Sequence, residues 1–230
     1  MTARMLRRVL AAALTLVLGA ALAACSSSGP SYLERLGSAV KDAVLAPEPK
    51  PARERSRAEL EEIESAVIAV SFGGRRALLV PLADNGGHLD YRDGAGRAVR
   101  LFGGAVSSTE GLGRDLAAVR FAVDDPLAHP RPLAAWPARV FREYQFRERN
   151  GPQYGITLSC GFHTLARETI EIVERSYDVV RVSEVCANQR REVVNTHWVE
   201  PETGFVWRSE QWLGPVLGPV TVEIIRPYTG

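Results

Sequence analysis

The chain carries three successive hydrophobic patterns, and each predicts a different structure. Residues 9–21 form a continuous apolar run of 13 residues. From residue 67 onward, apolar and polar residues alternate with a period of two, which is typical of strands that bury one face. Between these regions, residues 32–46 have apolar positions at helical spacing, which predicts an amphipathic helix with Leu33, Leu36, Val40 and Val44 on one face.

The apolar run at the N-terminus has the pattern of an export signal. Arg4, Arg7 and Arg8 precede it, and the small residues that follow it end at Cys25. A helix of 13 residues reaches only about 20 Å, short of the roughly 30 Å hydrocarbon core, so we expect no permanent span. The ending resembles the lipobox of bacterial lipoproteins, which implies removal of a signal peptide, residues 1–24, and attachment of lipid to Cys25. An ordinary signal peptide that leaves Cys25 as a free thiol is the alternative.

The predicted lipid would anchor the mature protein. Two or three acyl chains hold a protein firmly at a bilayer, because each buried CH₂ contributes about 0.8 kcal/mol. Ser26 and Ser27 stand where lipoproteins retained at the inner membrane commonly carry Asp, so resemblance to this sorting rule implies the periplasmic face of the outer membrane. Residues 25–55 are expected to form a lipidated tether, the short helix and a Pro-rich linker.

The alternating patterns of residues 56–230 predict one β-rich domain. Ser56 and Glu59 offer a capping box for a second short helix that ends near Ile63. The fold class is mainly β, a single antiparallel open barrel or sandwich preceded by one or two short N-terminal helices. Residues 164–174 would also suit a helix, but we predict a strand there. Turn residues indicate hairpins of 67–72 with 75–82, 89–91 with 98–102, and 140–149 with 154–162.

Composition and charge narrow the range of partners. The 230 residues are 46% hydrophobic and 24% charged, as in a globular protein. The 28 basic and 27 acidic residues nearly balance, and the basic residues are scattered rather than gathered in one run. This distribution argues against nucleic acid as a partner.

The chain has three cysteines, and the predicted lipid accounts for one of them. Cys160 and Cys186 remain, in a compartment oxidising enough to join them. A disulfide that closes a loop of this size would stabilise the fold by about 3 to 4 kcal/mol if it is unstrained. Two unrelated buried thiols are the alternative. A zinc site is less favoured, because no CxxC or paired His spacing accompanies the cysteines.

No motif in the sequence predicts a catalytic centre or a metal site. No serine lies in the Gly-flanked nucleophile pattern of hydrolases. Paired glycines at 103–104 and at 111 and 113 match no phosphate-binding fingerprint, so we interpret them as sharp turns. We therefore expect no enzymatic activity, no metal and no cofactor other than the covalent lipid on Cys25. The histidines lie far apart along the chain, at His88, His129, His163 and His197.

The last third of the chain carries the most distinctive aromatic pattern. Two strands on either side of a turn at 201–204 form a predicted hairpin with tryptophans on both faces. Alternation places Trp207 and Gln211 on one face, and Arg208 and Trp212 on the other. Such side chains could stack on and hydrogen-bond a sugar, or they could form a tryptophan core with a solvated ion pair. The candidate contacts to a polysaccharide or a protein partner are Trp198, Trp207, Arg208, Gln211 and Trp212.

Two blocks of sequence resemble a known family. Residues 103–116 read GGAVSSTEGLGRDL, and residues 209–215 read SEQWLGP. The first block resembles the pattern GG..V..T.GLG.DL, and the second resembles the C-terminal signature, of the YjbF/GfcB group of outer-membrane lipoproteins. The lipobox matches this group as well, and Cys160 and Cys186 lie where its alphaproteobacterial members carry a cysteine pair. His197 departs from the group, which more often has tyrosine there.

The resemblance implies a fold and a biological setting. The fold of the group is an open, mostly antiparallel barrel. The resemblance implies no enzymatic activity. Its members act beside an outer-membrane β-barrel and periplasmic proteins of a capsule or exopolysaccharide system. Our main hypothesis is a non-catalytic accessory lipoprotein that docks on this export barrel. The alternatives are a periplasmic polysaccharide-binding module that uses exposed tryptophans and, less favoured, a lipid carrier with an apolar cavity.

Overall fold

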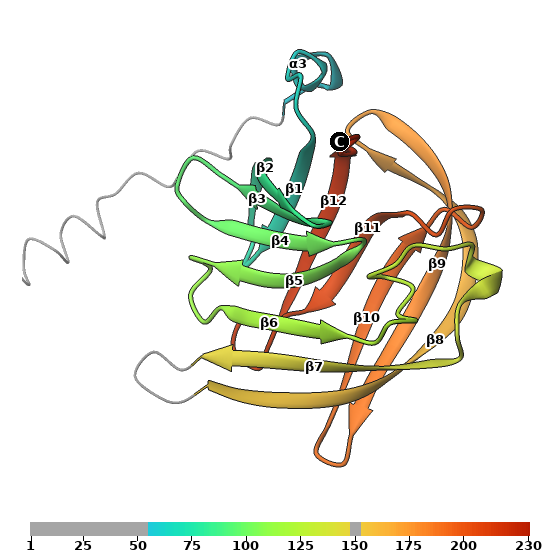
Figure 1. The fold of residues 1–230 in the computed structure, drawn as a ribbon. Helices are drawn as coiled ribbons and strands as arrows, with labels where there is room; N and C mark the ends of the chain where they lie inside the picture. Colours follow the sequence, from blue (N-terminus) through green and yellow to red (C-terminus); the bar gives the residue numbers. More distant parts are fainter. Residues whose placement is uncertain (1–54, 148–152) are drawn as a thin grey trace, which may run out of the picture. The chain divides into compact units, whose positions relative to one another are not determined.

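A computed structural model of the protein describes residues 55–147 and 153–230 (Figure 1). The predicted lipidation site Cys25 and the predicted helix at 32–46 lie outside the described residues. The helices are α3 (Arg57–Glu61) and the 3-10 helix η1 (Leu133–Ala135). The strands are β1 (Val67–Phe72), β2 (Arg75–Asn85), β3 (His88–Arg92), β4 (Ala98–Phe102), β5 (Ala105–Glu110), β6 (Leu116–Phe121), β7 (Arg139–Arg147), β8 (Gln153–Ile172), β9 (Arg175–Asn188), β10 (Arg191–Val199), β11 (Val206–Trp212) and β12 (Pro219–Arg226).

The strands form one antiparallel sheet that is nearly closed into a barrel. The strand order is β5-β4-β3-β2-β1-β12-β11-β10-β9-β8-β7-β6, so two meanders join where β1 pairs with β12. The edge strands β5 and β6 lie side by side, which brings the two ends of the sheet together (Figure 1). The predicted fold class, mainly β with an antiparallel open barrel, is confirmed, and the three predicted hairpins all form.

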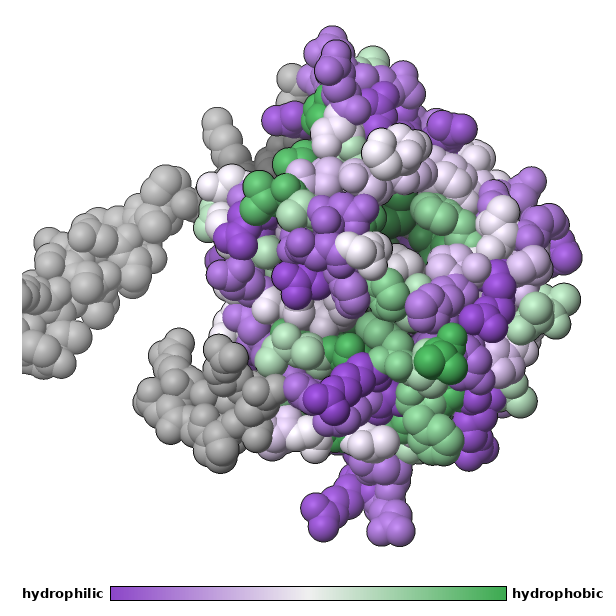
Figure 2. Space-filling model, viewed as in Figure 1, coloured by the Kyte–Doolittle hydropathy of each residue, from purple (hydrophilic) through white to green (hydrophobic). Residues whose placement is uncertain are grey.

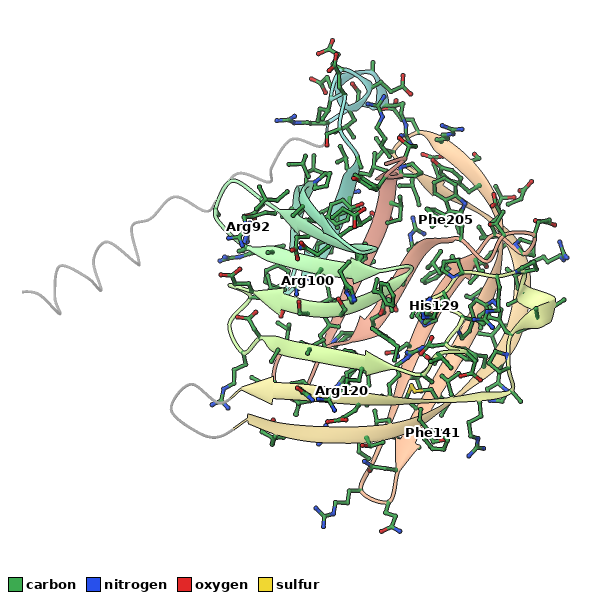
Figure 3. All side chains as sticks on the ribbon, in the orientation of Figure 1. Arg92, Arg100, Arg120, His129, Phe141 and Phe205 are labelled. Atoms are coloured by element: carbon green, nitrogen blue, oxygen red, sulfur yellow. A yellow bond between two sulfur atoms is a disulfide. The ribbon has the colours of Figure 1, made fainter. Side chains whose placement is uncertain are left out.

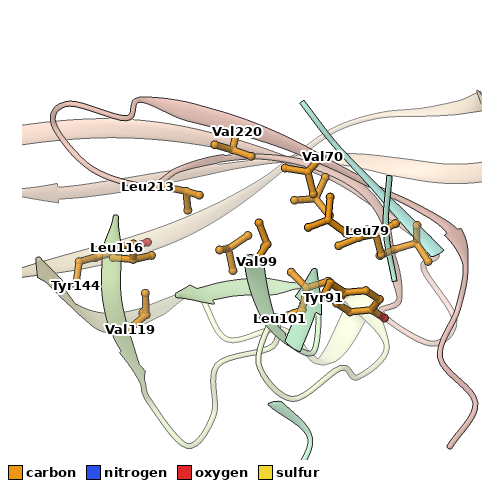
Figure 4. Packing of buried hydrophobic residues seen from close by; sticks show 14 of the residues in the cluster. Val70, Leu79, Tyr91, Val99, Leu101, Leu116, Val119, Tyr144, Leu213 and Val220 are labelled. Atoms are coloured by element: carbon orange, nitrogen blue, oxygen red, sulfur yellow. The ribbon is translucent and has the colours of Figure 1, made fainter. Parts of the chain in front are cut away.

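The main core lies inside the curved sheet. Side chains of β1–β5 and of β6–β12 pack together in this core, so it joins the two meanders (Figure 4). Each apolar side chain that is fully buried contributes about 1.5 to 3 kcal/mol, which makes this cluster the main source of stability. The labelled members are Val70, Leu79, Tyr91, Val99, Leu101, Leu116, Val119, Tyr144, Leu213 and Val220.

A second apolar cluster covers the opposite face of β1 and the end of β12. Val67 and Ala69 are at most 1% exposed, as are Ile68 and Val70 on the core side. The expectation that each strand buries one face is therefore wrong for β1, because the end of the long β8–β9 hairpin and α3 pack on its other face. The covering residues are Leu60, Ile170, Ile172, Tyr177 and Val179.

The predicted capping box begins the described fold. The Ser56 side chain accepts a hydrogen bond from the Glu59 backbone N–H, and the Glu59 carboxylate accepts one from the Ser56 backbone N–H at 2.8 Å. The helix ends at Glu61, two residues before the expected Ile63, since the chain then turns into β1.

An arginine of α3 holds the turn of the β8–β9 hairpin. Residues 164–172 are part of β8, as predicted, and the turn follows at Val173 and Glu174 with φ of 46° and 61°. Positive φ is unfavourable for a β-branched residue, so this backbone needs support. Arg57 supplies it by donating hydrogen bonds to the carbonyl oxygens of Ile172 at 2.6 Å, Val173 at 2.9 Å and Ile225 at 3.0 Å.

Candidate functional site

Gln211 connects the two motif blocks inside the barrel. Its amide Nε2 donates to the carbonyl oxygen of Gly104 at 2.9 Å, and its Oε1 accepts from the backbone N–H of Val106 at 3.0 Å. Nε2 also lies 2.8 Å from Ser209 Oγ. The side chain is 5% exposed, so these hydrogen bonds replace water. The block at 209–215 therefore holds the turn between β4 and β5, which belongs to the block at 103–116.

Both positions of this turn must be glycine, because a side chain at either one would clash with neighbouring atoms. A Cβ on Gly103 would lie 2.3 Å from the carbonyl oxygen of Leu127, and the residue has φ of 58°. A Cβ on Gly104 would lie 2.5 Å from a methyl group of Val206 on β11. The turn can approach β11 and the long connection before β7 only because both residues lack a side chain.

The rest of the first block braces the loop between β5 and β6. Asp115 accepts hydrogen bonds from Thr109 Oγ1 at 2.9 Å, from the Gly111 N–H at 3.0 Å and from the Leu112 N–H at 3.0 Å. Thr109 Oγ1 in turn accepts from the Leu116 N–H at 3.0 Å. These bonds join the two edge strands of the sheet at one end.

Substitution of Gly103 tests the close approach of the turn. Gly103→Ala should destabilise the fold more than Gly73→Ala, which has a similar φ of 53° but no heavy atom within 4 Å of the new Cβ. The control should lose about 1 to 2 kcal/mol from its backbone conformation alone. The free energy of unfolding in urea measures both losses, and equal losses would show that the contact with Leu127 is unimportant.

A buried arginine lies between two carboxylates inside the barrel. Arg142 Nε is 2.6 Å from Asp125 Oδ2, and its Nη2 is 3.0 Å from Asp125 Oδ1. On the other side, Nη1 is 2.6 Å from Glu184 Oε1 without hydrogen-bond alignment, so this contact is an ion pair. The three side chains are at most 2% exposed. Removal of Arg142 would leave two buried carboxylates without the cation that they share.

Hydrogen bonds extend this network across β9, β10 and β11. Asn195 Nδ2 donates to Glu184 Oε2 at 2.7 Å, and His197 Nε2 lies 3.0 Å from the same oxygen. Because an ionised carboxylate only accepts hydrogen bonds, we place a proton on His197 Nε2. Asn195 Oδ1 accepts from the Trp212 backbone N–H at 2.7 Å. The network thus reaches from β7 through β9 and β10 to β11.

The network changes the acidity of its members. Burial alone would raise the pKa of Glu184, but the charge of Arg142 and the hydrogen bonds from His197 and Asn195 outweigh it and lower this pKa from 4.5 to about 2. Burial would lower the pKa of Arg142, yet the nearby Glu184 and Asp125 carboxylates raise it well above its ordinary value. Burial also raises the pKa of Tyr144 beside them. These charges are therefore fixed over the physiological pH range.

The low pKa of Glu184 predicts a loss of stability in acid. The folded protein binds a proton at this carboxylate more weakly than the unfolded chain does, so the stabilisation is complete above pH 4.5 and declines as the pH falls toward about 2. The change should be on the order of 3 kcal/mol. Urea unfolding at a series of pH values should show a shallower dependence for Glu184→Gln, and identical slopes would contradict this assignment.

Loss of the central cation should be severe. Arg142→Leu leaves Asp125 and Glu184 without their shared partner, so we expect a loss of about 3 to 5 kcal/mol in the free energy of unfolding. Arg139→Leu on the same strand is the matched control, because Arg139 is exposed and its removal should cost about 0.5 kcal/mol or less. Thermal and urea unfolding give both values. Similar losses for the two variants would show that the network contributes little.

The structure contains the predicted disulfide beside this network. Cys160 of β8 and Cys186 of β9 lie opposite each other in the strand register and are joined through their sulfurs. Among the described residues, one group of potential metal ligands comes together, in which the two sulfurs and a Glu184 oxygen lie within 4.8 Å of one another. Sulfurs joined in a disulfide are not thiolate ligands, so this group does not fit a metal in its oxidised form. The expectation of no metal stays a prediction.

Trp198 and Arg208 lie on the outer face of the sheet. Trp198 Nε1 donates to Glu168 Oε1 at 2.6 Å, and the Arg208 guanidinium lies 5.7 Å from the centre of the Trp198 ring. Arg208 also forms an ion pair with Glu223 of β12 at 2.7 Å. These two candidates are thus joined in one row across β8, β10, β11 and β12, with their polar groups already paired.

The other candidates from the sequence lie elsewhere. Trp207 is half-buried, and its ring centre is 3.9 Å from that of Tyr177 and 4.7 Å from that of Phe205. Trp212 was expected on the face of Arg208, but its ring packs against Tyr144 at 5.4 Å, on the core side. Strict alternation fails for Trp212 because β11 ends there. The five candidates therefore do not form one surface.

Sequence reasoning did not identify the buried charge network. The signal was present in β7, where Val140, Arg142, Tyr144 and Phe146 alternate with exposed or half-buried residues. A strand pattern that buries its apolar members also buries an arginine of the same parity. The partners of that arginine could not be found in this way. Asp125 lies in the connection between β6 and β7, and Glu184 lies on β9, with the whole of β8 between it and Arg142 in the sequence.

The fold and the meeting of the two motif blocks define a class of protein, a barrel-shaped β domain that is braced by the turn glycines and by the hydrogen bonds of Gln211 and Asp115. The profile of the family described as group 4 capsule polysaccharide lipoprotein gfcB, YjbF, matches residues 34–225. The chain therefore belongs to this family. Membership makes it a lipoprotein of the cell envelope with a role in capsule or exopolysaccharide production. No protein with a curated description matches the chain.

A solved structure supports the fold. The crystal structure of the hypothetical lipoprotein YmcC from Escherichia coli K12 resembles this protein with a TM-score of 0.67 at 20% sequence identity. The alignment covers 88% of this chain and 99% of that one. Within residues 55–147 and 153–230, no helix is long and apolar enough to cross a membrane.

Proposed function

We propose that this protein is a non-catalytic accessory factor in the production or export of capsule polysaccharide or exopolysaccharide. Lipid on Cys25 would hold it at the periplasmic face of the outer membrane, where it would dock on an outer-membrane β-barrel and periplasmic proteins of the export system. The non-catalytic role is supported chiefly by the structural contacts of the motif residues. Gln211 and Asp115 of the two family blocks hold turns and loops together and are committed to backbone partners.

The charged groups inside the barrel support the same proposal. Arg142, Asp125 and Glu184 are paired and at most 2% exposed, so they are closed to a substrate. Catalytic acids and bases must reach a substrate proton, which these groups cannot do without opening the barrel. The lipid would give a weak docking surface a high effective concentration at the membrane without new contacts.

Replacement of the lipidated cysteine tests the tether. Cys25→Ala should release the protein from the membrane fraction and reduce extracellular polymer by at least about tenfold, because the gain in effective concentration is lost. Ser26→Asp is the matched variant, since it keeps the lipid but should retain the protein at the inner membrane. The measurements are membrane fractionation and the amount of secreted polymer per cell.

The two variants separate anchoring from location. Loss of secretion in both would support a role at the outer membrane, and cross-linking of the wild-type protein in its native envelope should then recover an outer-membrane β-barrel. Full secretion with soluble Cys25→Ala protein would refute the tethered role. Full secretion with Ser26→Asp would refute the outer-membrane location.

A further inference from the structure

One face of the barrel has an apolar hollow. Figure 2 shows it as a recess of hydrophobic residues surrounded by polar ones, and Figure 3, in the same orientation, labels Phe205 at this place. Phe205 directly precedes β11 and is half-buried. We call this feature the Phe205 hollow. An apolar recess with a polar rim is typical of sites that bind a ligand.

Three aromatic rings form a continuous group at the Phe205 hollow. The ring centres of Phe205 and Trp207 are 4.7 Å apart at 66°, and those of Trp207 and Tyr177 are 3.9 Å apart at 31°. Phe205 and Trp207 are half-buried, so part of each ring remains open to solvent. The exposed Arg175 lies with its guanidinium 5.5 Å from the centre of the Tyr177 ring. The group thus combines aromatic surface with a planar cation at its edge.

Tyr177 carries an unused hydrogen-bonding group. The residue is 9% exposed, and its Oη atom is buried with no hydrogen-bond partner among the described residues. A buried hydroxyl without a partner is unfavourable by about 1 to 3 kcal/mol, and buried polar groups in folded proteins nearly always have partners. Because Oη itself has no contact with solvent, a ligand hydroxyl would supply the missing partner after a shift of the rings that cover it.

We propose that the Phe205 hollow binds sugar rings of the exported polysaccharide. The apolar face of a pyranose ring would stack on Phe205 and Trp207, and its hydroxyl groups would meet Tyr177 Oη and the guanidinium of Arg175. This inference rests on the proposed function, because the polysaccharide is the ligand that this function supplies. An acyl chain fits less well, since it would leave the Tyr177 hydroxyl without a partner.

The other tryptophans considered from the sequence are less suited to this role. Trp198 already donates its Nε1 hydrogen to Glu168, and the guanidinium of Arg208 lies over its ring. Trp212 packs with Tyr144 and Phe146 on the core side. Trp207 therefore remains as the tryptophan that contacts the sugar.

The test uses the full-length lipidated protein in lipid nanodiscs. The probe is a set of oligosaccharides made by partial acid hydrolysis of the polymer that the producing strain secretes. Calorimetric titration should show binding, and Phe205→Ala should weaken it by roughly tenfold, which is the effect of losing about 1.4 kcal/mol of stacking. Trp212→Phe, at the far end of β11, is the matched aromatic control and should bind as the wild type does.

A second variant separates binding from folding. Tyr177→Phe removes only the hydroxyl group, so it should leave the thermal unfolding temperature unchanged or higher, because an unpaired buried group is lost. The same variant should weaken oligosaccharide binding several-fold. In the wild type the oligosaccharides should change the tryptophan fluorescence, and this change should be lost in Trp207→Phe and kept in Trp212→Phe.

The outcomes distinguish this inference from the proposed function. Absence of binding to the wild-type protein would refute the sugar site while leaving the secretion results with Cys25→Ala intact. Wild-type affinity in both Phe205→Ala and Tyr177→Phe would refute it in the same way. Native mass spectrometry that finds a bound lipid which is lost in Phe205→Ala would also refute it, in favour of an acyl chain. Binding of sugar combined with full secretion by Cys25→Ala would support the site and refute the tethered role.

Discussion

The structure depends on one buried cation. Arg142 neutralises Asp125 on one side and Glu184 on the other, within 2.6 Å of each, in a part of the barrel that water does not reach. One arginine does not fully balance two carboxylates, so Glu184 also needs the hydrogen bonds of Asn195 and His197. An ion pair in such a place is costly to desolvate and is tolerated only with this degree of satisfaction. The arrangement ties the long connection before β7 to β9 and β10, which belong to the other wall of the barrel.

The two family blocks, like this network, hold distant parts of the barrel together through polar side chains. The two meanders leave a seam between β5 and β6, where no ladder of strand hydrogen bonds joins the two edges of the described sheet. Asp115 and Thr109 brace one end of the seam through side-chain bonds to backbone groups. Gln211 holds the turn at the other end against β11. A few polar side chains thus reinforce the closure that the apolar core of both edge strands provides, and the glycines beside them allow the close approach.

The sequence predicted the strands well because local rules determine them. Turn glycines and period-two patterns are local, and so is the capping box of Ser56 and Glu59. The disulfide followed from the number of cysteines and the expected compartment. Contacts between distant residues could not be read in this way, as the placing of Trp212 on the core side shows. The burial of both faces of β1 was missed for the same reason, since it depends on the fold-back of a hairpin more than 80 residues away in the sequence.

The pairing of polar groups supports a proposed binding site outside the charge network and the Gln211 turn. Inside the barrel, the hydrogen-bonding capacity of Gln211 and the charge of Arg142 are spent on partners within the chain. A polar group that already has its partners gains little from a ligand, whereas one without partners gains a full hydrogen bond. Tyr177 Oη is such a group, and the Tyr177 ring contacts Trp207, which in turn contacts Phe205. In our proposal, the ion pairs and hydrogen bonds of the interior brace the scaffold, and the aromatic group at the Phe205 hollow binds the polymer.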